Sequence, residues 1–439
     1  MGKTSVKIGV ICLARKTFDF NAALDIYKKI QIDLKKIPNV EWRYIPELVI
    51  EEEEAIAAAL DLKSKNVDAV IAISGTFHLG ELILQLNKIL QKPILLWGLY
   101  ELPYNGGKIR LNSVCGLNLD SSNLYKTGTR DYHHIIGDQV DEDWIDAVRV
   151  LKAFSSSKIG IIGHHAKGFY NIDVDESILF KETGVLLQHF ELNEVWDFKV
   201  SDIDVGRRRE QVKEIFDTSG ITNAQLDKVT QLTAKLAGFM DKYGLNALAI
   251  RCWPEFAAEF GISPCAAMSI LQSENYVLGC EGDVLGLMSM LAQKAVGGET
   301  PFLTDFSQVD FEQNFTLLWH CGVAACNLWD EKCVRSLDTY FAGGKGVTAD
   351  FVMKPGKVSM LRIDSAGEEF RVFLQAADGL PMNKELKGTY LKTRFNDNVR
   401  VILDKIIRNG IAHHISMTYG KYIRPMEILA KIKGWKLIQ

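Results

Sequence analysis

The chain has 439 residues, of which 47% are hydrophobic and 24% charged; this balance is typical of a folded protein and excludes a disordered, collagen-like or coiled-coil chain. The 51 basic and 55 acidic residues give a formal net charge of -4 without a block of Lys or Arg, so we expect no nucleic-acid partner. No apolar run reaches the roughly 18 residues that cross a bilayer, and the first residues lack a signal-peptide pattern, so we expect a cytoplasmic location and no membrane partner.

The first part of the chain alternates predicted strands and helices. The strands are continuous apolar runs, which are typical of strands buried on both faces of a parallel sheet. We expect strands over residues 6–13, 68–74 and 93–99, helices over 21–36 and 79–90, and a further helix that follows the acidic residues 51–54 and ends at Leu62. This order predicts a Rossmann-like α/β domain over residues 1–155.

The loop after the strand at 68–74 contains Thr76 and His78. Loops that leave the carboxyl ends of parallel strands are where open α/β sheets bind ligands. Both residues are therefore candidates for substrate binding, and a simple turn or helix cap is the alternative.

A second Rossmann-like α/β domain is predicted over residues 156–330. It follows three serines at 155–157 that are typical of a linker, and it opens with another apolar strand. The loop at 163–168 lacks both the dinucleotide fingerprint and the Walker ending, which argues against a nucleotide site. A later buried strand, 245–251, brings Trp253 to the end of a sheet.

The pattern changes at about residue 330. Short alternating segments separated by Gly, Pro and Asp turns indicate an antiparallel sheet or small barrel. These segments are 346–352, 357–363, 369–374 and 388–394, and a last helix is expected over 425–433. We therefore predict a β-rich, barrel-like C-terminal domain over residues 331–439.

Four positions in the second half could carry chemistry: Glu281, Asp305, His320 and the pair His413–His414. Each lies among apolar or small residues, where an ionised side chain needs a partner or a metal to offset its desolvation. Carboxylates and imidazoles together suit Mn²⁺ or a similar divalent cation. Taken singly, a carboxylate in such a position is more often a helix cap or turn residue than a ligand, and such a histidine is usually a core residue. The spacing of these residues along the chain does not show that they converge.

Six motifs in order resemble the L-fucose isomerase and L-arabinose isomerase superfamily, and the match is nearer to the fucose isomerase-like branch. They are Arg251-Cys-Trp-Pro-Glu-Phe256, Gly261-Ile-Ser-Pro-Cys265, Cys280-Glu-Gly-Asp-Val284, Pro301-Phe-Leu-Thr-Asp305, Trp319-His-Cys-Gly322 and Gly410-Ile-Ala-His-His414. The resemblance implies two α/β domains followed by a β-rich domain, a Mn²⁺-dependent aldose–ketose isomerase, and a homo-oligomer in which a neighbouring subunit completes each site.

The resemblance also implies roles for individual residues. Glu281 and Asp305 match the two carboxylates that bind the metal and handle protons, and His414 matches the C-terminal histidine ligand. His320 matches a further ligand in the arabinose branch only; because residue 305 is Asp, as in the fucose branch, a role outside the coordination sphere stays open for His320. The expected substrate-binding residues are Arg15, Thr76, His78, Trp253, Trp319 and His413.

The expected reaction is isomerisation of a pentose, 6-deoxyhexose or related substituted sugar through a cis-enediol, with Glu281 as base and Asp305 as partner acid. The metal would act as a Lewis acid on the sugar oxygens. A hydride shift stays open. The alternatives are a catalytically inactive sugar-binding protein of the same fold and another metal-dependent sugar-modifying enzyme, such as a lyase or hydrolase.

Overall fold

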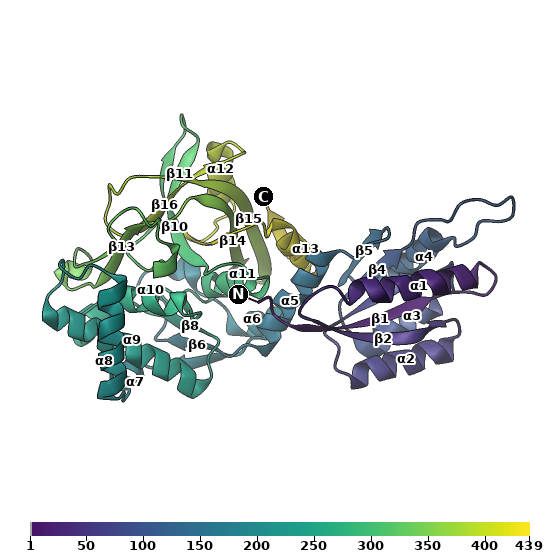
Figure 1. The fold of residues 1–439 in the computed structure, drawn as a ribbon, viewed down its shortest axis with the longest axis horizontal. Coiled ribbons are helices and arrows are strands. Elements are labelled where there is room, and N and C mark those ends of the chain that lie inside the picture. The colour runs from purple at the N-terminus through teal and green to yellow at the C-terminus, as the bar shows by residue number, and fades with distance from the viewer. Residues whose placement is uncertain (1) are drawn as a thin grey trace. The chain divides into compact units, whose positions relative to one another are not determined.

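The computed structural model describes residues 2–439, which divide into two compact units. The smaller unit contains residues 2–152 and 424–435, and the larger unit contains residues 153–423 and 436–439. Both units contain parallel strands together with helices, which confirms the predicted α/β class (Figure 1). Within residues 2–439, no helix is both long and apolar enough to cross a membrane.

The smaller unit is a parallel sheet with strand order β2-β1-β3-β4-β5 and helices on both faces. Helix α1 covers one face and α2 the other (Figure 1). The strands are β1 (Val6–Leu13), β2 (Val40–Val49), β3 (Ala69–Ser74), β4 (Ile94–Gly98) and β5 (Tyr132–Ile136). The helices are α1 (Phe20–Leu34), α2 (Glu52–Ser64), α3 (Glu81–Leu90), α4 (Ser113–Lys126), α5 (Glu142–Ser156) and, from the far end of the chain, α13 (Ile423–Lys433).

Helix α5 shows that one sequence expectation is wrong. Ser155 and Ser156 were expected in a linker, but they form the last turn of α5. The helix continues because its apolar side chains Trp144, Ile145, Val148 and Phe154 recur at helical spacing and are buried. The serines simply end this amphipathic pattern.

The larger unit begins with a second parallel sheet, of order β7-β6-β8-β9. Its strands are β6 (Ile159–Ile162), β7 (Leu187–Phe190), β8 (Ala247–Ile250) and β9 (Val277–Gly279). The accompanying helices are α6 (Glu176–Thr183), α7 (Leu192–Trp196), α8 (Asp202–Ile215), α9 (Asn223–Tyr243), α10 (Cys265–Ser273) and α11 (Val284–Ala295), with a π-helical turn at Phe256–Phe260.

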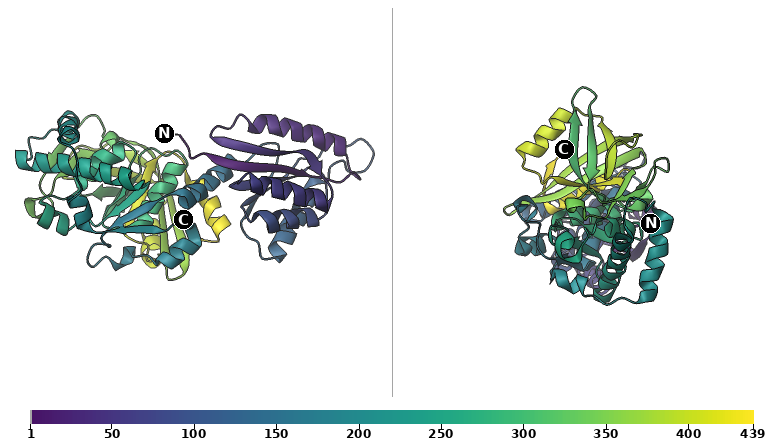
Figure 2. Two further views of the ribbon diagram at one scale, coloured as in Figure 1. Left: turned by 90° about the horizontal axis from the view of Figure 1, so that it is seen from below. Right: turned by 90° about the vertical axis from the view of Figure 1, so that its left-hand side faces the viewer.

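The remainder of the larger unit is built around a closed barrel of six antiparallel strands, which confirms the β-rich expectation. The barrel order is β16-β11-β10-β17-β14-β15, and β15 pairs back onto β16. Its strands are β10 (Phe302–Asp310), β11 (Phe315–His320), β14 (Gly356–Ala366), β15 (Glu369–Leu380), β16 (Thr389–Phe395) and β17 (His414–Tyr419). The same sheet continues into β12 (Ser336–Asp338), β13 (Thr348–Val352) and β18 (Lys436–Ile438), and α12 (Val399–Arg408) precedes β17. Figure 2 shows these strands gathered on one side of the larger unit, away from the α8 and α9 helices.

Two barrel strands, β10 and β11, come before the predicted start of the β-rich domain at residue 331. They carry Asp305 and His320, so both residues belong to the barrel. Helix α11 joins the parallel sheet to the barrel: it starts directly after β9, and its Gln293 side chain donates to Ser359 O at 3.0 Å and Ser416 O at 3.1 Å. At the other end of α11, just after β9, Asp283 Oδ2 lies 2.9 Å from His414 Nδ1, so the carboxyl end of β9 meets barrel strand β17.

Candidate active site

The first carboxylate lies in a tight turn between β9 and α11. Glu281 has a positive φ of 63°, and Gly282 follows with φ 75°; positive φ costs free energy for a residue with a side chain and clusters at functional sites. Two backbone hydrogen bonds fix the turn, from Ala166 N to Glu281 O and from Gly282 N to Ile250 O, both at 2.9 Å. A Cβ at Gly282 would lie 2.6 Å from His164 O, so glycine is required for the loop after β6 to pack here.

The barrel register brings Asp305 to His414. The two residues are directly paired across the antiparallel strands β10 and β17, and paired residues have side chains on the same face of a sheet. Asp305 also pairs with Trp319 on β11. Because β10 pairs with both strands, Trp319, Asp305 and His414 lie side by side across the sheet.

These elements place five of the sequence-predicted residues together. Glu281, His413 and His414 form one group, and Asp305, His320 and His414 form a second, with the candidate ligand atoms of each group within 4.8 Å of one another. His414 Nε2 belongs to both: it lies 3.3 Å from Glu281 Oε2 and 3.8 Å from Asp305 Oδ1. It has no well-directed hydrogen bond to either carboxylate.

The hydrogen bonds of His414 direct one ring nitrogen into the site. Its Nδ1 lies 2.9 Å from Asp283 Oδ2, and Asp283 is itself fully buried, caps α11 and pairs with the buried Arg362. A carboxylate that accepts from one imidazole nitrogen orients the ring and makes the other nitrogen the ligand. His414 is thus held with Nε2 between Glu281 and Asp305.

His413 has the opposite arrangement. Asn171 Nδ2 donates to His413 Nδ1 at 3.0 Å, and His413 Nε2 lies 3.4 Å from Glu281 Oε2. Because Nδ1 accepts, the neutral ring carries its proton on Nε2 and donates it to Glu281. His413 therefore positions a carboxylate and presents no free nitrogen lone pair.

His320 is buried at the end of β11 and has a third arrangement. Its Nδ1 accepts from the Cys321 backbone N–H at 2.8 Å, so the neutral ring carries its proton on Nε2. Burial lowers the pKa of His320 and favours this neutral form. The Nε2 atom is buried, close to Asp305, and has no partner among the described residues.

The carboxylates and imidazoles of the site shift one another's pKa values. Burial alone would raise the pKa of Glu281, but the hydrogen bond with His413 and the nearby imidazole of His414 hold it well below its usual range. Glu281 is therefore ionised at neutral pH. Burial alone would lower the pKa of His414, but the hydrogen bond to Asp283 and the negative charge of the nearby Glu281 raise it to about 10. A metal bound at His414 Nε2 would therefore displace a proton from that nitrogen.

The donor set suits a divalent cation. Asp305 Oδ1, His320 Nε2 and His414 Nε2 are buried polar atoms without a hydrogen-bond partner in residues 2–439, and such atoms are costly unless something binds them. Two carboxylates and an imidazole form a mixed oxygen and nitrogen set without thiolates, as Mn²⁺ accepts. Glu281, Asp305 and His414 fit such an ion; the proton on His320 Nε2 makes that residue a donor to an oxygen.

Aromatic side chains line one side of the site. Phe169 packs edge-on against His413 with ring centroids 5.2 Å apart, and against Trp253 at 5.8 Å. Trp319 stacks with its neighbour His320 at 6.5 Å, and its indole N–H donates to Lys387 O. Trp319 thus lies against His320, and Trp253 lies against Phe169, which in turn contacts His413. Substrate binding by the two tryptophans stays a prediction.

The predicted residues Arg15, Thr76 and His78 lie in the smaller unit, at the carboxyl ends of β1 and β3. Thr76 Oγ1 accepts from Arg15 N at 2.8 Å. His78 is fully buried, with Nδ1 2.9 Å from Thr76 O and Nε2 3.0 Å from the Asp120 carboxylate. Both ring nitrogens of His78 are occupied, which fits the alternative role in holding the turn.

Three residues that contact the site were absent from the candidates: Asp283, Asn171 and Phe169. Asp283 lies two residues after Glu281, within the motif Cys280-Glu-Gly-Asp. An aspartate at such a position usually caps a helix, which gives no sign of a role in the site. Its second role depends on a partner 131 residues away. Nothing in the local sequence marks Asn171 or Phe169, because their partner His413 lies far along the chain, directly before β17.

The fold and the site define an α/β protein whose β-barrel and parallel sheet jointly enclose a carboxylate and imidazole cluster. Against known proteins, the chain is 27% identical over 420 residues to a sulfoquinovose isomerase from Priestia aryabhattai, covering 93% of each chain. It is 26% identical to another from Alkalicoccus urumqiensis, over 97% of this chain and 98% of that one. A sulfoquinovose isomerase from a Clostridium species is 25% identical over 75% and 76% of the two chains.

No protein-family model matches the chain. Among solved structures, the match to a transporter solute-binding protein from Conexibacter woesei covers 69% of this chain and 76% of the other, at 12% identity and a TM-score of 0.18. A likeness this low carries no argument about fold or function.

Proposed function

We propose that the protein is a metal-dependent aldose–ketose isomerase that acts on a substituted hexose, with a 6-sulfonated 6-deoxyglucose as the leading substrate. The observation that carries the proposal is the convergence of Glu281, Asp305 and His414 Nε2 in one buried site. The relatives named sulfoquinovose isomerase, similar over nearly the whole chain, support the reaction and the substrate class.

Isomerisation moves one proton between adjacent carbons. In the proposed reaction, Glu281 takes the proton from C2 of the aldose, and the electron pair forms the C1–C2 double bond of a cis-enediol while O1 gains a proton. Glu281 then returns its proton to C1, and O2 loses one as the ketone forms. Asp305 handles the hydroxyl protons, and the His320 Nε2–H donates to a substrate oxygen as negative charge develops on it.

Glu281, Asp305 and His414 are the residues that would hold the metal, for which Mn²⁺ is the leading candidate. Such an ion would supply Lewis-acid stabilisation of charge on the sugar oxygens. His413 keeps Glu281 oriented through its Nε2, and Asp283 keeps His414 oriented through its Nδ1. Phe169 and Trp253 offer an apolar wall to the C–H face of the sugar.

The test begins with metal analysis of the purified protein. The chelated protein is then assayed for ketose formation from sulfoquinovose and from an aldose panel, with and without added Mn²⁺. We expect activity to disappear on chelation and to return with Mn²⁺. If sugars bind but no ketose forms with any divalent cation, the protein is an inactive sugar-binding relative, and a product differing in mass from the substrate would indicate a lyase or hydrolase.

Running the reaction in D₂O tests the enediol. Proton transfer through Glu281 exposes the proton to solvent exchange, so deuterium should enter C1 of the ketose. A product without deuterium would favour a hydride shift. We also propose, on the strength of the sequence resemblance alone, a homo-oligomer in which a neighbouring subunit completes each site. Of the three residues expected to contribute, Arg15 is partly exposed and stays a candidate for a substrate contact, whereas Thr76 and His78 are fully buried and hold the turn. Sedimentation at equilibrium gives the number of subunits.

A further inference from the structure

A cavity in the larger unit shares Trp253 with the apolar wall of the candidate active site and is lined otherwise by residues that the proposed reaction does not use. Its volume is about 430 Å³, and it is lined by Trp253, Pro254, Ala257, Ala258, Phe341, Ala342, Gly343 and Lys345. Small-molecule sites are typically clefts of roughly this size, with apolar walls and a few polar groups. The cavity therefore has the dimensions of a site for part of a sugar.

Two sets of contacts connect this cavity to the active site. On one side, Trp253 contacts Phe169, which contacts His413, at centroid distances of 5.8 and 5.2 Å. On the other side, the hydroxyl of Tyr340, the residue before Phe341, donates to Cys321 O at 2.7 Å, directly after His320. A substrate bound by its C1 end at Glu281 could extend into the cavity past Trp253.

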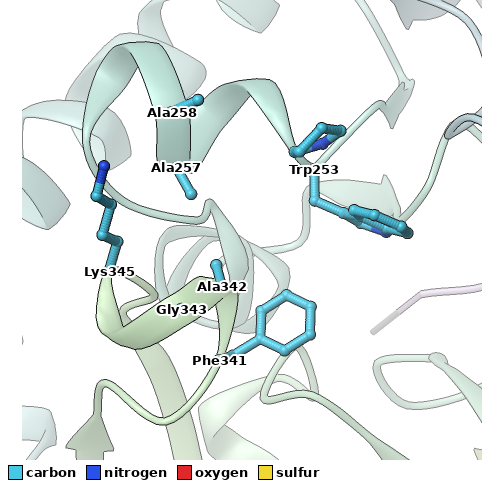
Figure 3. A pocket seen from close by; sticks show the side chains of 8 residues that line it. Trp253, Ala257, Ala258, Phe341, Ala342, Gly343 and Lys345 are labelled. Atoms are coloured by element: carbon cyan, nitrogen blue, oxygen red, sulfur yellow. The ribbon is translucent and has the colours of Figure 1, made fainter.

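Lys345 is the one charged residue among the described residues that line the cavity. Figure 3 shows Trp253 and Phe341 at one end of the cavity and Lys345 at the other. Between these ends, Ala257 and Ala258 lie on one wall, and Ala342 and Gly343 lie on the other. Within residues 2–439, the Lys345 ammonium has no ion pair, whereas Arg251, close to Trp253 in sequence, is paired with Glu255. The turn that carries Lys345 is closed by a hydrogen bond from Gly346 N to Phe341 O at 2.9 Å.

We infer that this cavity is the subsite for the anionic substituent at C6 of the sugar and that Lys345 binds its sulfonate oxygens. The inference rests on the proposed function for the identity of the sugar. The apolar residues suit the C5 and C6 carbons, and an unpaired ammonium at the far end offers three donors to an anionic group with three oxygens. The subsite would thus select a sulfonated sugar over its neutral analogue.

Lys167, in the loop that packs against Glu281, is the natural competitor for this role. It is also exposed and has no ion pair among the described residues, but it does not line the cavity. The Lys167→Met variant is therefore a matched control for Lys345→Met. Lys345→Arg keeps the charge and should restore most of the binding that the Met variant loses.

The experiment measures calorimetric binding of sulfoquinovose and of 6-deoxyglucose to each Mn²⁺-loaded protein, together with kcat and KM for both sugars. We expect Lys345→Met to weaken sulfoquinovose binding about 10- to 100-fold and to lower the preference for sulfoquinovose over 6-deoxyglucose by a similar factor. Unchanged preference in Lys345→Met, or loss of preference in Lys167→Met instead, overturns the inference. If the wild-type protein binds sulfoquinovose in a Lys345-dependent way but does not convert it, the subsite is supported and the isomerase function is wrong. If the wild-type protein binds no sulfonated sugar, the subsite is wrong.

Discussion

At the scale of single residues, the three histidines of the site differ in which ring nitrogen is already engaged. His414 Nδ1 donates to the Asp283 carboxylate. His413 Nδ1 accepts from the Asn171 side chain, and His320 Nδ1 accepts from the backbone N–H of Cys321. The remaining nitrogen of His414 is free to give its lone pair to a metal that displaces its proton, whereas the remaining nitrogen of the other two is an N–H donor. Partners outside the site therefore separate the proposed metal ligand, His414, from two hydrogen-bond donors.

Replacing Glu281 by Gln should lower kcat at least about 1,000-fold, because the amide cannot accept the C2 proton. The substitution keeps the shape of the side chain, so circular dichroism and the unfolding midpoint should stay close to wild type. Glu299→Gln, which alters an exposed carboxylate paired with Lys354, is the matched control and should retain turnover. Wild-type activity in the Glu281 variant would remove this residue from the reaction.

Removing His414 should cost more metal than removing His413. His414→Ala deletes the nitrogen between the two carboxylates, and we expect metal affinity to fall more than about 100-fold. His413→Ala deletes a residue that only orients Glu281, which is an effect of about 10-fold. Competitive titration of the apo-proteins with a metal indicator gives both affinities, and the reverse order would exchange the two assignments.

At the scale of elements, the sequence was a good guide to strands and helices but not to their pairing. Buried strands such as β3 and β6 were predictable from continuous apolar runs, and the antiparallel strands after residue 330 from alternation. The pairing of Asp305 with His414 was not, because register in a barrel depends on how all six strands close. The strands β10 and β11 were not predicted as barrel strands because they lie before residue 330, where the short alternating segments begin.

An ion-pair cluster between α5 and α13 makes a pH prediction for the smaller unit. Asp141 accepts from Arg424 Nη2 at 2.8 Å and lies 3.2 Å from His133 Nε2. Burial opposes ionisation, but these hydrogen bonds lower the pKa of Asp141 to about 2. Because the folded-state pKa is lowered, the stabilisation is present above the unfolded pKa of about 3.9 and is lost as pH falls toward 2.

We therefore expect Asp141→Asn to reduce the free energy of unfolding of the smaller unit at pH 7 by about 1–2 kcal/mol, a value discounted because Arg424 is largely exposed. The difference from wild type should shrink as the pH is lowered from 5 to 3 in urea titrations. Asp143→Asn is the control: Asp143 also contacts Arg424, but burial raises its pKa, so this variant should lose no stability at pH 7. A deficit in the Asp141 variant that is independent of pH would contradict the electrostatic explanation.

At the scale of the whole molecule, the last residues of the chain divide between the two units. Helix α13 belongs to the smaller unit with residues 2–152, whereas β18 pairs with β15 in the larger unit. The sequence could not show this, because an amphipathic helix has an apolar face but no mark of which core it covers. The division into domains at residues 155 and 330 stays a prediction. The two compact units instead divide the chain after residues 152, 423 and 435.

This division predicts where a core substitution will be felt. Leu429 of α13 is 1% exposed and Ile438 of β18 is 5% exposed, and truncating a buried Leu or Ile to Ala costs about 2–5 kcal/mol. In hydrogen exchange, Leu429→Ala should reduce protection of β1, β3 and β4 at the other end of the sequence and leave β10 and β17 unchanged. Ile438→Ala, nine residues later, should reduce protection of β14 and β15 instead. We also expect added metal to increase the protection of β10 and β17 but not of β1. Equal loss of protection in both units from either variant would mean that the two units unfold together, and added metal would then protect β1 as well.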